Sequence, residues 1–159
     1  MPRAPRSTRA AGLGARRPLA AAVILAALAP AAALAAEDGV SVQDAWMRVI
    51  VPSRPAAGYF TLQNATDTAR TLTGASSPSC AAVMLHQSLQ SSGQDRMVMV
   101  TSVPVPAHGA LSFAPGGYHL MCMEPGAGVR PGAAVPVTLR FGDGGALTAD
   151  FAVRGARGQ

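Results

Sequence analysis

The sequence predicts an all-β fold, an antiparallel sandwich with Greek-key connections. Past residue 40, short apolar stretches alternate with turn signals rich in Gly, Pro, Ser and Asn, which is typical of strands joined by tight turns. Beyond the first 36 residues, no window of useful length has the apolar periodicity of a helix. Most of the 13 prolines fall between the apolar stretches, where they oppose long helices. Many short strands at this spacing are characteristic of a layered β domain.

Nine strands are expected in chain order. Each is a run of apolar or β-branched residues bounded by turn residues, such as PGG at 115–117 and GDGG at 142–145. The expected strands span residues 44–51, 58–63, 70–75, 82–86, 96–103, 109–113, 118–123, 134–141 and 147–153.

The first 36 residues have the composition of a secretory signal peptide. Five arginines precede an uncharged Ala/Leu-rich run that ends in small residues, and these are the parts of a cleavable leader. An uncleaved membrane anchor is the alternative, because the run is almost long enough to span a bilayer, but Pro30 and the cleavage-like triplet at 33–35 oppose it. We therefore expect a signal peptide, residues 1–36, and an exported, periplasmic domain, residues 37–159, with no membrane span in its mature form.

The charge balance excludes one class of function. Eight of the 13 basic residues remain once the five in the leader are removed, and they face eight acidic residues, so the mature domain is close to neutral. Without a basic stripe, binding to nucleic acid loses its main driving force, and no nucleic-acid partner is expected. An enzyme is not expected either, because the sequence lacks a G-x-S-x-G nucleophile elbow and its acidic residues form no pattern that suggests acid–base catalysis.

The two cysteines predict a disulfide bond. Export would place the domain in an oxidising compartment, where cysteines persist as disulfides, and Cys80 and Cys122 are the one pair that the sequence offers. Closing a loop of that length stabilises the fold by about 4 kcal/mol in the chain-entropy model.

Soft and imidazole side chains gather in three of the expected strands. The segments VMLH at 83–86, RMVM at 96–99 and HLMCM at 119–123 contain five of the seven methionines and two of the three histidines. Side chains in a strand alternate between its two faces. His119, Met121 and Met123 should therefore share one face, with Leu120 and Cys122 on the other.

The same alternation places Met97 beside Met99 and Met84 beside His86. Three neighbouring strands could thus present a cluster of nitrogen and sulfur donors at one rim of the sandwich. Any one of these methionines would ordinarily be read as core filler, and a lone histidine as an ordinary surface or core residue. Their clustering with matched parity indicates a metal site.

Copper(I) suits this donor set best. It is a soft d¹⁰ ion that thioether sulfur binds well. Zinc favours thiolate, imidazole and carboxylate, while calcium and magnesium need oxygen ligands that these segments lack. The candidate ligands are His86, Met97, His119 and Met121, in an exposed site at the rim, from which an ion could be handed to a partner. Auxiliary ligands could come from Met84, Met99 and Met123, whereas His108, in a turn, is assigned no role.

The spacing of the four candidates carries a family resemblance. Ten residues separate His86 from Met97, twenty-one separate Met97 from His119, and one separates His119 from Met121. This spacing resembles the H-x10-M-x21-H-x-M signature of the PCu(A)C-type periplasmic copper chaperones. The stretch PGGYHLM at 115–121, DAWMR at 44–48 and AGYF at 57–60 also resemble this family. The similarity covers roughly residues 40–153, nearly the whole mature domain.

The resemblance implies a cupredoxin-like β-sandwich that binds one Cu(I) ion at these four positions. It also implies delivery of copper for cytochrome c oxidase assembly, either to subunit II, which holds the dinuclear Cu(A) centre, or through Sco-type proteins. A monomer is expected. Two departures from the family are present. The chain ends in RGARGQ where some members carry a His/Met-rich Cu(II)-binding tail, and Gln87 replaces the methionine that some members place after the first histidine.

Two other functions compete with this interpretation. A blue-copper electron carrier would use two histidines, a cysteine thiolate and a weak axial methionine, and Cys122 lies between Met121 and Met123. Two points oppose that function: Cys122 should face away from His119 and Met121 in the strand, and its expected pairing with Cys80 would leave no thiolate. The second alternative is a metal-free sandwich module whose methionines form core or a protein-binding surface.

Overall fold

A computed structural model describes residues 35–37, 39–91 and 94–157 of the chain. The chain divides into two units, Met1–Ala31 and Ala32–Gln159, and all of the described residues belong to the second. The predicted leader, residues 1–36, therefore lies outside the described residues except for Ala35 and Ala36. These two residues form part of a short strand, β1 (Ala35–Glu37), that pairs with β2.

All regular secondary structure among the described residues is β-strand, which confirms the all-β prediction. No helix within this part of the chain has the length and apolar character that crossing a membrane requires. The strands after β1 are β2 (Val40–Arg48), β3 (Ala56–Asn64), β4 (Arg70–Ser76), β5 (Cys80–Ser91), β6 (Gln94–Met99), β7 (Val103–Val105), β8 (Gly109–Phe113), β9 (Tyr118–Pro125), β10 (Ala134–Phe141) and β11 (Ala146–Arg154).

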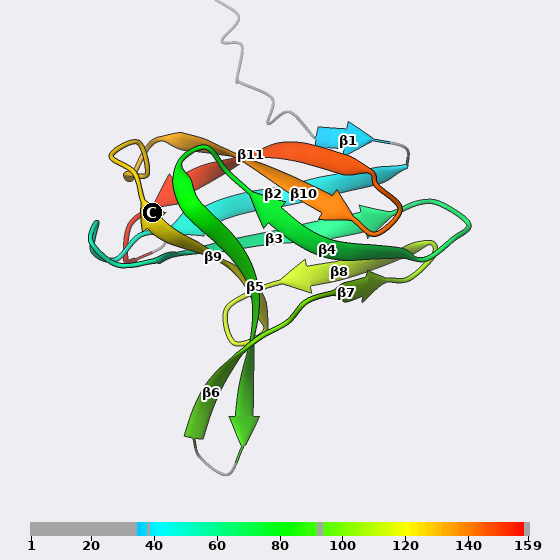
Figure 1. Cartoon of the computed structure of the whole chain (residues 1–159), viewed down its shortest axis with the longest axis horizontal. Helices are drawn as coiled ribbons and strands as arrows, with labels where there is room; N and C mark the ends of the chain where they lie inside the picture. The colour runs from blue at the N-terminus through cyan, green and yellow to red at the C-terminus, as the bar shows by residue number, and fades with distance from the viewer. Residues whose placement is uncertain (1–34, 38, 92–93, 158–159) are drawn as a thin grey trace, which may run out of the picture. The chain divides into compact units, whose positions relative to one another are not determined.

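The strands wrap around one core (Figure 1). They follow the order β6-β5-β9-β8-β3-β2-β11-β10-β4-β7, and additional pairings join β9 to β3 and β5 to β4. The β4–β5 pairing joins the two ends of this strand order, so the sheet closes on itself. Strands that are distant in sequence, such as β2 and β11, are neighbours in the sheet, as in Greek-key connections. Most pairs are antiparallel as predicted, but β2 and β11 are parallel, as is the short β8–β9 contact. No hairpin turn joins β2 to β11, so nothing local forces them to run in opposite directions.

Strand boundaries differ from the prediction most at β5, which runs over Cys80–Ser91 where residues 82–86 were expected, and at the segment 96–103. The run 96–103, expected to be one strand, forms β6 and β7 because its two halves pair with different neighbours, β5 and β4 respectively. β7 lies at the edge of the sheet, where Pro104, which has no N–H to donate, is tolerated.

The core is built by strict alternation along the strands. In β11, every second residue from Leu147 to Val153 is buried, while the intervening residues are exposed. Phe60 stacks on Phe113 with ring centroids 4.3 Å apart, and Phe151 meets Phe60 edge-on at 5.6 Å. Burial of this apolar surface supplies the main favourable free energy of folding.

A bulge in β2 reverses which of its side chains face the core. Val40 and Val42 are buried before the bulge and Met47 after it, so the alternation shifts by one residue. The pairing with β3 breaks its register between Gln43 and Trp46, and Asp44 has a left-handed φ of 51°. Because an extra residue in one strand changes its parity, Trp46 and Arg48 face outward. This strand was predicted over 44–51, which misses both its start at Val40 and the bulge.

A disulfide joins the two strands that carry most of the candidate ligands. The Sγ atoms of Cys80, at the start of β5, and Cys122, within β9, are 2.01 Å apart. This confirms the predicted pairing. The bond fixes β5 against β9 from the core side, because the Cys122 side chain is fully buried.

Candidate metal centre

The register of β5, β6 and β9 brings the soft donors onto one outer face. Across the β5–β9 pair, His86 lies opposite His119, and Met84 lies opposite Met121. Across the β5–β6 pair, Ser88 lies opposite Met97. Residues directly opposite each other in antiparallel strands project to the same side. The structure therefore confirms that the side chains of the histidines and methionines in these three strands project to the same face of the sheet.

The residues between these donors face the core. Leu85 and Leu120 are opposite each other and buried, and Cys122 is buried with its sulfur in the disulfide. Cys122 thus points away from His119 and Met121 and has no thiolate to offer. The blue-copper alternative lacks its cysteine ligand, since the sequence has no third cysteine.

The two imidazoles face each other edge to face. Their ring centroids are 5.8 Å apart and their planes meet at 84°. His119 is almost fully buried, and its Nδ1 lies 3.1 Å from the carbonyl oxygen of Gly117. A carbonyl can only accept a hydrogen bond, so Nδ1 carries the proton and Nε2 keeps its lone pair. This hydrogen bond orients the ring as carbonyls commonly orient metal-ligating histidines.

The surroundings of His86 differ from those of His119. Its Nδ1 is buried and has no hydrogen-bond partner among the described residues. Burial lowers the pKa of His86 below its ordinary value of 6.5, and the charge that His119 can carry lowers it further. A buried, unpaired nitrogen that favours the neutral form is suited to donate its lone pair to a metal ion.

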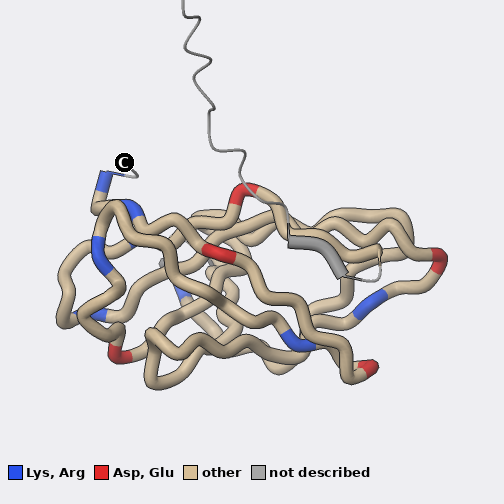
Figure 2. Tube along the Cα trace, turned by 90° about the horizontal axis from the view of Figure 1, so that it is seen from above, with Lys and Arg blue, Asp and Glu red and all other residues tan. Residues whose placement is uncertain are grey.

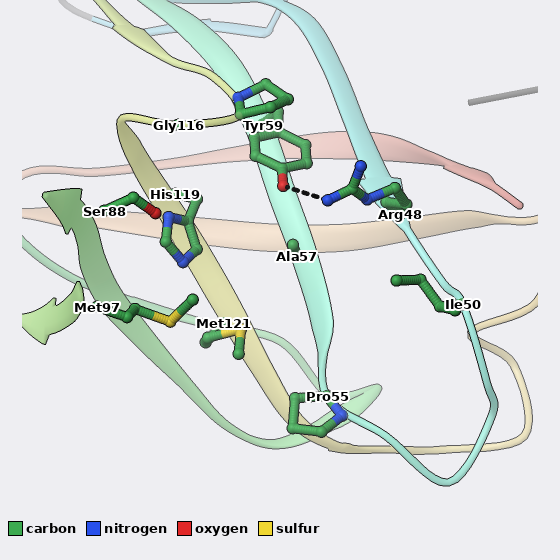
Figure 3. Close-up of a pocket in the computed structure, with 11 residues that line it drawn as sticks. Arg48, Ile50, Pro55, Ala57, Tyr59, Ser88, Met97, Gly116, His119 and Met121 are labelled. Carbon is green, nitrogen blue, oxygen red and sulfur yellow. Dashed lines mark hydrogen bonds between the residues drawn. The ribbon is translucent and has the colours of Figure 1, made fainter. Parts of the chain in front are cut away.

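Three of the four candidate ligands line a common hollow. Met97, His119 and Met121 contribute to the wall of a pocket of about 280 Å³. Figure 3 shows Met97, His119 and Met121 gathered on one side of the pocket. His86 is not part of this wall and approaches His119 from the neighbouring strand β5. Met97 is 53% exposed, so its side of the pocket is open to solvent, whereas His119 is buried at 4%.

The auxiliary methionines differ in how close they come. Met99 lies directly opposite His86 and Met84 directly opposite Met121, so both adjoin a candidate ligand. Met123 lies opposite Ala82, one step farther along β9. His108 is remote from this cluster and pairs with Asp67 in an exposed contact of 2.8 Å.

An aromatic and cationic cluster lies beside the histidines and methionines and was not predicted from the sequence as part of the site. Tyr59 is buried on the outer face, with its ring centroid 6.4 Å from that of His119 and 4.7 Å from that of Trp46. Arg48 covers the Tyr59 ring at 5.7 Å. The predicted strand 44–51 contained Trp46 and Arg48, but the bulge that turns them outward has no simple sequence signal.

Comparisons with known proteins agree with this architecture. The sequence matches the family model "Putative lipoprotein LpqE-like" over residues 40–153. The curated relative "Putative lipoprotein Lxx21020" of Leifsonia xyli subsp. xyli is 33% identical over 108 residues, which are 67% of this chain and 64% of that protein. The chain therefore spans slightly less than two thirds of the length of this relative.

Solved structures of similar fold include proteins with bound copper. The copper-bound PCuAC domain from PmoF2 superposes with a TM-score of 0.65 at 22% identity, covering 77% of this chain and 98% of that domain, a likeness that concerns the fold alone. The solution structure of apo-DR1885 from Deinococcus radiodurans has a TM-score of 0.58 at 32% identity, covering 92% of this chain and all of that one. The CuI form of DR1885 gives the same score and identity over 71% of this chain and 76% of that one.

Proposed function

Since the chain belongs to the LpqE-like family and has the fold of PCuAC domains, we propose that it is a copper chaperone that binds one Cu(I) ion through His86, Met97, His119 and Met121. The observation that carries the proposal is the convergence of two imidazoles and two thioethers, from three strands, on one outer face of the sheet.

The donor atoms suit a monovalent soft ion. Thioethers need no deprotonation and stay available where thiols would oxidise, and neutral imidazoles add affinity without adding charge. The Nδ1 of His86 and the Nε2 of His119 are two nitrogen donors without a hydrogen-bond partner in the part of the chain that the structure describes. A carrier rather than an enzyme is proposed, because four protein donors would leave no open position for a reacting water.

Isosteric removal of the thioethers tests the site. A Met97→Leu, Met121→Leu variant keeps apolar volume but removes both sulfur donors. Anaerobic titration with Cu(I) against a competing chelator should give tight one-to-one binding for the unaltered protein and a loss of at least about a hundredfold in the variant, from two lost ligand bonds. Met47→Leu, at a buried methionine on the inner face, is the matched control. Equal Cu(I) affinity in all three proteins would exclude the site, and X-ray absorption of the loaded protein would count its nitrogen and sulfur neighbours.

The destination of the ion is the finer part of the proposal. Its support is the family signature, from which we infer delivery to subunit II of cytochrome c oxidase, for the Cu(A) centre, or to a Sco-type protein. Mixing the Cu(I)-loaded protein with each purified acceptor domain, and measuring copper on both after separation, tests the inference. Retention of copper by this protein against both acceptors would contradict it.

Export is proposed on the leader predicted over residues 1–36 and on the lipoprotein description of the matching family. Neither cysteine of the sequence is available for lipid attachment, because Cys80 and Cys122 are bonded to each other. We therefore propose a free periplasmic form. The mass of the protein recovered from periplasmic extracts tests this, since cleavage without added lipid predicts the bare mass of the mature chain.

A further inference from the structure

The outer face that carries the soft donors continues without a break into a cationic region. One row of paired residues crosses five strands: Met84 on β5, Met121 on β9, Ala57 on β3, Arg48 on β2 and Arg154 on β11. Only the small side chain of Ala57 separates Met121 from Arg48 in this row. Two strand spacings of about 4.8 Å each separate their backbones.

The space above Ala57, between Met121 and Arg48, is the pocket that Met97, His119 and Met121 line. Ala57 forms part of its lining, between Met121 on one side and Arg48 on the other, and Ser88 and Ile50 contribute to the rim (Figure 3). None of the residues that line the pocket is acidic. The hollow therefore joins the candidate metal ligands to a guanidinium group.

Arg48 is held in place but not neutralised. Its Nη2 donates a hydrogen bond of 3.3 Å to the hydroxyl of Tyr59, and its guanidinium covers the Tyr59 ring. Within the described part of the chain, neither Arg48 nor Arg154 forms a salt bridge with a carboxylate. Figure 2 shows that the arginine positions gather mainly on the side of the chain trace where the C-terminus lies.

Arg48 and Arg154 are paired across the neighbouring strands β2 and β11, so their positive charges belong to the same face of the sheet. The Arg154 guanidinium lies over the Trp46 ring, 5.0 Å from its centroid, whereas Arg48 lines the pocket, and an anion bound there would be attracted by this positive charge. Tyr59 takes one of the five donors of the Arg48 guanidinium, and the rest are suited to the oxygens of a carboxylate or sulfonate. The chemistry of the hollow is thus that of an anion subsite placed beside a soft-metal site.

We propose that this pocket receives the anionic group of the ligand that takes copper away, with Arg48 as its anchor. This rests on the proposed Cu(I) site. The anchored ligand brings its donor atom to the Met97–Met121 side, a new bond to copper forms, and one thioether bond breaks. The ion remains Cu(I), so no electron is transferred and no further reactant is needed. The exposure of Met97 makes its thioether the one most easily displaced.

Two arms of one experiment test the proposal and separate free ligands from protein ligands. In the first arm, stopped-flow measurements follow Cu(I) removal by bathocuproine disulfonate, which is anionic, and by neocuproine, a neutral chelator with the same donor head. In the second arm, the acceptors are two synthetic peptides with one Cu(I)-binding segment flanked by glutamates or by glutamines.

Arg48→Gln should lower the ratio of anionic to neutral transfer rates by about three- to tenfold, as expected for one charge acting over several ångströms under partial screening. Arg48→Lys should restore much of the ratio, and Arg140→Gln, an exposed arginine outside the pocket, should leave it unchanged. An effect in the first arm alone identifies a small anionic ligand. An effect in the second arm alone identifies an acidic protein segment.

Unchanged ratios in both arms for Arg48→Gln would overturn the proposal. A copper-free measurement distinguishes this from failure of the copper site itself: nuclear magnetic resonance of the apo protein titrated with propionate. Shifts at Arg48 and Tyr59 that vanish in Arg48→Gln support the subsite even if copper binding were lost, and their absence in the unaltered protein counts against it. Thermal unfolding of each variant checks that it is folded.

Discussion

Two histidines that lie opposite each other in the sheet contribute to the candidate site in different ways. The ring of His119 is buried and fixed through Nδ1 by the Gly117 carbonyl, whereas His86 keeps a buried nitrogen without a partner. The sequence predicted that His119 shares a face with Met121 and His86 with Met84, and the register of β5 and β9 confirms this sharing, because side-chain parity within a strand depends only on local geometry. It did not show that Met99, rather than Met97, lies directly opposite His86, since register between strands depends on the whole hairpin.

The lowered pKa of His86 leads to a prediction about pH. The folded protein binds a proton at His86 less readily than the unfolded chain does, so apo stability should fall as the pH drops from 6.5 through the lower, folded-state pKa. Cu(I) affinity should also fall below about pH 6, by about tenfold per pH unit for each imidazole that must lose its proton. Chelator competition at several pH values measures this, with His86→Gln expected to show a shallower dependence. Affinity that is constant between about pH 5 and 8 would contradict histidine ligation.

At the scale of the strands, β5 and β9 form the frame of the site. They carry three of the four candidate ligands, and the disulfide joins them on the opposite, core-facing side. The disulfide and the existence of both strands could be predicted from the sequence, but the prediction for β5 covered only residues 82–86 and missed its continuation to Ser91. The bulge at Asp44 in β2 was not predicted, because neither alternation along VSVQDAWMR is apolar over its whole length. The side chains that turn inward change parity where the pairing with β3 breaks its register. The cluster of Trp46, Arg48 and Tyr59 was therefore missed as a feature of the site.

Reduction of the disulfide should destabilise the domain. The bond closes a loop with a sequence separation of 42 residues, and its loss should cost about 4 kcal/mol of the free energy of unfolding. Urea denaturation with and without a reductant measures the difference. A Cys80→Ala, Cys122→Ala variant should match the reduced protein and respond to no reductant. Cu(I) affinity should fall as well, since β5 and β9 are then held by hydrogen bonds and packing alone. A midpoint that is the same in both conditions would show that the bond contributes nothing to stability.

For the molecule as a whole, copper binding and folding should be coupled. The four candidate ligands come from β5, β6 and β9, spread over 36 positions of the sequence from His86 to Met121, and only the folded sheet brings them together. A ligand that binds the folded state alone raises the free energy of unfolding with its concentration, by about 4 kcal/mol when free ligand exceeds its dissociation constant a thousandfold. For a domain of this size, that corresponds to an increase in Tm of roughly 10 °C. Anaerobic calorimetry with chelator-buffered Cu(I) measures the shift. The Met97→Leu, Met121→Leu variant should unfold at one temperature with or without copper, whereas an equal shift in that variant would mean that Cu(I) binds elsewhere on the chain.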